Sequence, residues 1–142
     1  MKLRKGITLV EIVAVIALIA IISLVAVNAF RNLNEGARVA ALDVSHDAIV
    51  TAVRMYQASS GGSAPTTVAA LVPFLEEVTD AAGITDLIVR IGAGTSNPTA
   101  LTITFPNPGE VSIVSTITVS RPFNGRIGTY AGGTYTRTNI IS

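Results

Sequence analysis

The chain has no cysteine, one histidine and few charged residues. Without cysteine no disulfide forms, so packing and backbone pairing alone must hold any folded region together. Charged residues make up 13% of the chain, with 10 Lys+Arg against 9 Asp+Glu, so the overall charge gives no support for nucleic-acid binding. The single histidine, His46, has no cysteine or cluster of acids at metal-ligand spacing and no pairing with a serine and an acid.

Other chemical motifs are also missing. Gly92 and Gly94 are not followed by the Gly-Lys-Ser/Thr of a phosphate-binding loop. Beyond Asp86 the only acid is Glu110, so an oxygen-rich calcium site is not expected there. We therefore expect no enzyme, no metal site and no cofactor.

A long apolar segment is the most prominent feature that the sequence does contain. From residue 7 to residue 27 only Thr8, Glu11 and Ser23 are polar. As a helix this stretch would be about 31 Å long, enough to span the hydrocarbon core of a bilayer. Three basic residues precede it and none lies inside it, so residues 1–6 are predicted to be cytoplasmic and residues after about Asn28 to lie outside.

This segment has two ordinary explanations. Val27-Asn28-Ala29 has the small residues that signal peptidase accepts, which would give an exported binding domain starting at Phe30. A simple membrane anchor is the second. The apolar run is longer than a usual signal-peptide core of about 7–15 residues, and neither explanation accounts for Glu11 in an apolar setting.

The residues at the start of the chain carry a specific motif. Lys2-Leu3-Arg4-Lys5-Gly6 is followed by Ile7-Thr8-Leu9-Val10-Glu11. This arrangement resembles the class III signal of type IV pilins and of the related pseudopilins: a basic leader ending in Gly, a hydrophobic residue, Thr-Leu, an aliphatic residue and Glu. The resemblance implies that a prepilin peptidase/N-methyltransferase cleaves between Gly6 and Ile7 and methylates the new amine of Ile7.

The resemblance also implies how the chain assembles. Glu11, with Thr8 beside it in the motif, would be the assembly site. Its carboxylate would pair first with the Ile7 amine of its own chain, one helical turn away, and then with that of a neighbour. Two unit charges 4 Å apart interact by about 4 kcal/mol at an effective dielectric constant of 20, enough to select a register among apolar helices.

The partners and location follow from the same resemblance. The chain would lie in the cytoplasmic membrane, meet an inner-membrane assembly machinery and polymerise with copies of itself into a pilus at the bacterial surface. Such a filament would serve adhesion, motility or DNA uptake, and nucleic-acid contact stays open. The alternative is a pseudopilin of a secretion or competence system in the cell envelope; the lack of an expected calcium site favours a pilin.

The family resemblance implies an α+β fold in which a long N-terminal helix packs on a small antiparallel sheet. We expect a leader at 1–6, a transmembrane or filament-core helix at 7–28, and an amphipathic continuation of that helix at 29–58. A connector with short helices follows at 59–85, and an antiparallel sheet at 86–142. The helix-breaking Gly and Pro common in pilins are replaced by Ala20 and Asn28, so a continuous helix is predicted, with at most a kink near Asn28.

The amphipathic part of the helix shows two apolar stripes. The bulkier stripe is assigned to the sheet and consists of Leu42, Ile49, Val53 and Tyr56. The other, rich in alanine, is assigned to close helix packing and consists of Phe30, Leu33, Ala37, Ala41, Val44, Ala48, Ala52 and Met55. Gly36 marks the expected bend.

The polar residues of this part are predicted to face solvent. Asp43, Asp47 and Arg54 would form the polar face, and His46 would be exposed or half-buried. Arg31, Arg38 and Arg54 could be taken for a DNA-contacting row, but ordinary ion pairs with Glu35, Asp43 and Asp47, at the surface or between subunits, are the expectation.

The last part of the chain is divided by turn signals. Thr66 or Thr67 would cap a short helical turn, and Pro73 would begin another helix that carries Glu76 and Glu77 and stops at Gly83. Alternating residues at 87–91 and 101–105 and β-branched residues at 111–119 predict strands. One or two more strands are expected between 126 and 141, interrupted at Gly132-Gly133, giving three to five in all.

Overall fold

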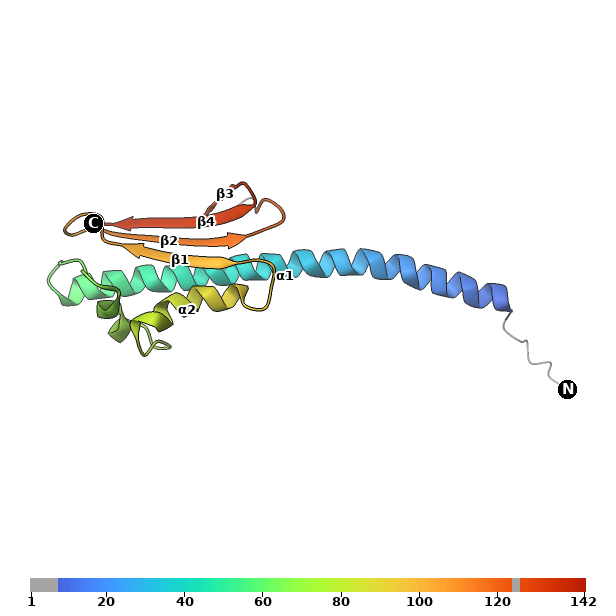
Figure 1. Cartoon of the computed structure of the whole chain (residues 1–142), viewed down its shortest axis with the longest axis horizontal. Helices are drawn as coiled ribbons and strands as arrows, with labels where there is room; N and C mark the ends of the chain where they lie inside the picture. The colour runs from blue at the N-terminus through green and yellow to red at the C-terminus, as the bar shows by residue number, and fades with distance from the viewer. Residues whose placement is uncertain (1–7, 124–125) are drawn as a thin grey trace. The chain divides into compact units, whose positions relative to one another are not determined.

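The computed structural model describes residues 8–123 and 126–142. The chain divides into two units, 1–35 and 36–142, which are described separately. The elements are α1 (Leu9–Ser59), the 3-10 helix η1 (Val68–Phe74), α2 (Ala81–Gly92), β1 (Thr99–Thr104), β2 (Val111–Thr118), β3 (Thr129–Ala131) and β4 (Thr134–Ile141). Figure 1 shows them along the chain.

The described part of the first unit is the N-terminal portion of α1. The helix runs through Ala20 and Asn28 without interruption, which confirms the continuous helix predicted from the lack of Gly and Pro at these positions. Gly36 also lies within α1, and the division between the two units falls immediately before it.

The second unit contains a four-stranded sheet in the order β1-β2-β4-β3, and the three neighbouring pairs are all antiparallel (Figure 1). β3 and β4 form a hairpin, with Ala131 opposite Thr134. The two residues between them, Gly132 and Gly133, have φ of 56° and 80°, as a two-residue hairpin turn requires. The expected sheet of three to five strands is therefore confirmed.

The core of this unit lies between one face of the sheet and α1. The bulkier stripe supplies Leu42, Ile49 and Val53, all fully buried, and they cluster with inward-facing residues of β2 and β4. This confirms the assignment of that stripe to the sheet. In the alanine-rich stripe Ala41 and Ala48 are exposed, whereas Ala52 is buried, and the packing of this stripe on other helices stays a prediction. The chain thus has the predicted α+β fold.

The strand predicted at 87–91 is wrong, because these residues belong to α2. The Asp80 side chain accepts a hydrogen bond of 2.8 Å from the backbone N–H of Gly83 and so caps the helix. Ile84 and Ile88, one turn apart, are fully buried against the core. A period of four residues therefore prevails over the local alternation, and the sheet begins at Thr99 rather than at residue 86.

The short helices of the connector also differ from the prediction. Thr67 precedes η1 but its side chain makes no capping hydrogen bond, and Pro73 lies inside that helix and does not begin a second one. Gly83 was expected to stop a helix and instead lies in the first turn of α2. Glu76 and Glu77 fall between the two helices, and the ring of Phe74 packs edge-on to Tyr56 of α1 at 6.0 Å.

Candidate assembly site and a buried polar cluster

The predicted assembly residues Thr8 and Glu11 meet at the beginning of α1. The backbone N–H of Glu11 donates to the Thr8 carbonyl at 3.0 Å and lies 3.3 Å from the Thr8 hydroxyl oxygen. Thr8 therefore caps the helix, and Glu11 occupies its first turn, where the helix dipole favours an acid. Gly6 and Ile7 lie outside the described residues, so the cleavage, the methylation and the pairing of Glu11 with an Ile7 amine remain predictions.

The apolar side chains that follow are exposed. Every large hydrophobic residue from Leu9 to Val27 is at least 49% exposed. Fully burying one such side chain is worth about 1.5–3 kcal/mol. A run of them left in water is therefore very unfavourable, and a bilayer or other protein must cover it. By length and composition α1 is able to cross a membrane.

The polar residues within this apolar stretch differ in how they are satisfied. The Ser23 hydroxyl donates to the Ile19 carbonyl at 2.7 Å, so its polarity is met within the helix. Thr8 serves as the cap. The Glu11 carboxylate, by contrast, has no hydrogen bond or ion pair with any residue in 8–123 or 126–142. Among the described residues 8–27, it is the one polar side chain that needs a partner from elsewhere.

A second polar site, not predicted from the sequence, lies between α1 and the sheet. Asp43, His46 and Asp47 follow the helical spacing that places them on one face of α1. His46 is fully buried. Its Nε2–H donates to the Asn139 side-chain oxygen at 2.9 Å, and its Nδ1 accepts from the Ser115 hydroxyl at 2.8 Å. The prediction of an exposed or half-buried histidine was therefore wrong.

The environment of His46 determines its charge. Burial lowers the pKa of the imidazole from its ordinary value of 6.5, and the nearby Arg137 acts in the same direction. The hydrogen bond to Asn139 and the carboxylates of Asp47 and Asp43 oppose this shift without cancelling it. The neutral ring, which is both donor and acceptor, matches its two partners.

The two carboxylates of α1 are held by arginines from the C-terminal part of the chain. Arg137, whose side chain is 5% exposed, lies 3.3 Å from Asp43 and 2.7 Å from Asp47. Arg126 approaches Asp43 at 3.5 Å. Asp47 and Arg54 are exposed as predicted, whereas Asp43 is half-buried. Within the chain both acids pair with arginines that follow β2 rather than with arginines of α1, and ion pairs between subunits stay a prediction. Arg31 and Arg54 are exposed, and Arg38 is half-buried.

A signal for this cluster was present in the sequence. β4 alternates, and its inward phase reads Tyr135, Arg137, Asn139 and Ile141, while its outward phase begins with Thr134, Thr136 and Thr138. Polar inward residues on a strand require polar partners on the facing helix, and the α1 triplet supplies them. Ser115 and His46 are both fully buried, so the centre of this cluster connects helix to sheet, while Asp47 at its edge is exposed.

No grouping of three His, Cys, Asp or Glu side chains able to hold a metal ion occurs within 8–123 and 126–142. Comparison with known proteins adds no assignment, because no protein-family model, curated protein or solved structure matches this chain.

Proposed function

We propose that this chain is a structural subunit of a type IV pilus-like filament. After cleavage between Gly6 and Ile7 it polymerises through the N-terminal part of α1, with the cytoplasmic membrane as its location before assembly. The observation that carries the proposal is the exposed apolar helix with one unpartnered carboxylate, Glu11, in its first turn.

A bilayer alone is a poor explanation of that combination. It would cover the aliphatic side chains, but an acid within a bilayer costs up to about 2.5–3.5 kcal/mol. A neighbouring chain covers the same apolar surface and brings an amine to Glu11, which turns a cost into a register-setting ion pair. The motif at residues 2–11 supports cleavage at the position that creates this amine.

The second unit supports the same function. Its sheet is held to α1 by an apolar core and by the cluster around His46 and Arg137, without any disulfide. A folded domain joined to an apolar helix has the parts that a filament subunit needs: a helix to bury in the filament and a domain to display on the surface.

The test is replacement of Glu11 by alanine, with Ser23→Ala as the matched control. Both changes remove a polar group from the apolar segment, but the Ser23 hydroxyl is already satisfied by the Ile19 carbonyl. Expressed in the native host, Glu11→Ala is expected to insert normally and to lower the yield of sheared filaments at least about tenfold, the ratio that 1.4 kcal/mol represents. Ser23→Ala should assemble like the wild type. Normal filaments from Glu11→Ala would refute the pairing.

A further inference from the structure

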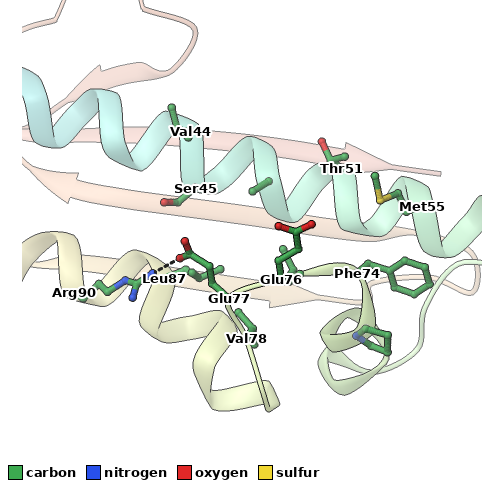
Figure 2. A pocket seen from close by; sticks show the side chains of 13 residues that line it. Val44, Ser45, Thr51, Met55, Phe74, Glu76, Glu77, Val78, Leu87 and Arg90 are labelled. Carbon is green, nitrogen blue, oxygen red and sulfur yellow. Dashed lines mark hydrogen bonds and ion pairs between the residues drawn. The ribbon is translucent and has the colours of Figure 1, made fainter.

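A groove lies within the second unit, along the exposed side of α1. It has a volume of about 660 Å³ and is lined by Val44, Ala48 and Met55 of α1, by Leu75 of the connector and by Leu87 of α2. Figure 2 shows α1 along one side of it and the connector and α2 along the other. Val44 is 71% and Met55 51% exposed, so this groove leaves uncovered an apolar part of the helix that the sheet does not reach.

The groove carries one negative charge without a partner. Glu77 pairs with Arg90 at 3.1 Å. Glu76 is exposed and has no hydrogen bond or ion pair with any other residue in the described ranges. In Figure 2 the Glu76 side chain extends from the connector toward α1, over the groove. An occupant with an apolar side chain and a neighbouring positive charge would match both properties.

The first unit carries such a combination. Val27, Phe30, Arg31 and Asn34 have the i, i+3, i+4, i+7 spacing that places them on one face of α1. Phe30 is 71% exposed. Arg31 is exposed, is the only basic residue between positions 8 and 35, and has no ion pair with the other residues that the structure describes. An aromatic anchor beside an arginine is typical of residues that dominate protein interfaces.

We propose that the groove binds the Val27–Asn34 face of a second copy of this chain. Phe30 of that copy enters between Met55 and the connector, and its Arg31 pairs with Glu76. This is the helix-in-groove mode of recognition, read by anchors at helical spacing. The inference rests on the proposed filament function and adds a second contact between subunits, separate from the ion pair between Glu11 and the Ile7 amine.

The contact joins two different surfaces of the same chain. An interface of this heterologous kind leaves a free groove on one copy and a free helix face on the other, so it propagates as a ring or an open helical filament. A self-complementary surface would stop at a dimer. The groove therefore gives the assembly the head-to-tail direction that a filament requires. The pairing of Glu76 with Arg31 favours a second copy of the chain over lipid as the occupant.

Charge reversal tests the contact. Glu76→Arg and Arg31→Glu are each expected to lower filament yield at least about tenfold, and the double variant should recover to within about twofold of the wild type. Arg54→Glu is the matched control, because Arg54 is also an exposed arginine of α1 and does not line the groove. It should assemble normally. Single variants that assemble like wild type, or a double variant that is not rescued, would overturn the Glu76–Arg31 pairing.

Disulfide trapping separates this inference from the proposed function, and the absence of native cysteine makes its readout clean. The pair Val27→Cys and Ala48→Cys, oxidised in cells, should give a ladder of cross-linked multimers. Val27→Cys with Thr138→Cys, on the outer face of the sheet, should not. If the Val27→Cys/Ala48→Cys variant forms filaments in normal yield but no cross-link, the groove contact is wrong and the filament proposal stands. Cross-linked multimers of a chain that forms no filaments would support the groove contact and contradict the filament proposal.

Discussion

The Tyr135 hydroxyl of β4 donates to the Asp43 carboxylate of α1 at 2.9 Å. The same hydroxyl oxygen accepts the backbone N–H of Gly128 at 2.9 Å. One fully buried phenol therefore joins the helix, the last strand and the segment before β3. Together with Arg137 and His46, it fixes the position of the sheet on α1 more specifically than apolar contact would.

Replacing Tyr135 by phenylalanine should destabilise the second unit by about 1–3 kcal/mol, because the change leaves the Gly128 N–H without its acceptor and removes one of the donors to Asp43. Denaturant unfolding of the full chain in detergent measures this. Tyr130→Phe is the control: Tyr130 lies directly opposite Tyr135 in the sheet and is 37% exposed, so the change should cost less than about 0.5 kcal/mol. Equal effects would contradict the role of the buried hydroxyl.

Stability should fall as the pH drops below 6.5 because of His46. Burial lowers the pKa of the folded imidazole below its ordinary value of 6.5, so the unfolded chain binds a proton at a pH where the folded chain does not. The stabilisation is fully present above 6.5 and declines as the pH falls toward the folded pKa. Unfolding free energies measured between about pH 7.5 and 5.5 should show this slope.

His46→Gln supplies the comparison for that slope, since His46 is the only histidine in the chain. The variant should be less stable at pH 7.5, because glutamine does not reproduce both ring hydrogen bonds. Its stability should change little between pH 7.5 and 5.5, above the range in which carboxylates titrate. A variant with the wild-type slope would assign the pH dependence to other groups.

Replacing Arg137 and replacing Arg90 should have different effects on stability, because Arg137 forms a buried ion pair and Arg90 an exposed one. Arg137→Met removes the partner of Asp43 and Asp47 and should destabilise the fold by about 3 kcal/mol, the lower end for a broken buried pair, because Asp47 is 56% exposed. Arg90→Met breaks the Glu77 pair, whose side chains are 61% and 75% exposed, and should cost less than about 1 kcal/mol. Thermal or denaturant unfolding compares them, and similar losses would contradict this account.

Two glycines are predicted to respond in opposite directions to alanine. At Gly128 an added Cβ would lie 2.5 Å from the Tyr135 ring and 2.6 Å from the Thr136 carbonyl oxygen, so Gly128→Ala should cost about 1–3 kcal/mol. At Gly36 the nearest atom would be the Phe123 ring at 3.6 Å, and helix propensity should make Gly36→Ala stabilising by up to about 1 kcal/mol. Stabilisation by Gly128→Ala would contradict the close approach of this backbone to Tyr135.

The sequence predicted those parts of the fold that depend on simple periodicity. The uninterrupted helix through Ala20 and Asn28, the burial of Leu42, Ile49 and Val53, and the Gly132-Gly133 hairpin all follow from local rules. α2 did not, because Leu87, Val89 and Ile91 alternate as in a strand although residues 81–92 form a helix. The Asp80 cap and the burial of Ile84 and Ile88 decided for the helix.

The buried cluster was missed for a different reason. A lone histidine between two aspartates has the composition of a solvated face, and only the position of β4 shows which residues oppose it. Ser115 lies directly opposite Arg137 in the sheet, so His46 and its two acids meet a complementary surface contributed from about 70–95 residues away. The alternation of β4 indicates that polar residues face inward, but it does not show which residues of α1 they meet.

The most direct test of the filament account is the intact mass, with N-terminal sequencing, of the protein sheared from the surface of its native host. The account predicts a chain that begins at methylated Ile7 and is recovered in long filaments. The same processed chain confined to the cell envelope would contradict a surface pilus and favour a pseudopilus. A chain that begins at Phe30 would contradict the account altogether, because Glu11 and the whole apolar segment would then be absent from the mature protein.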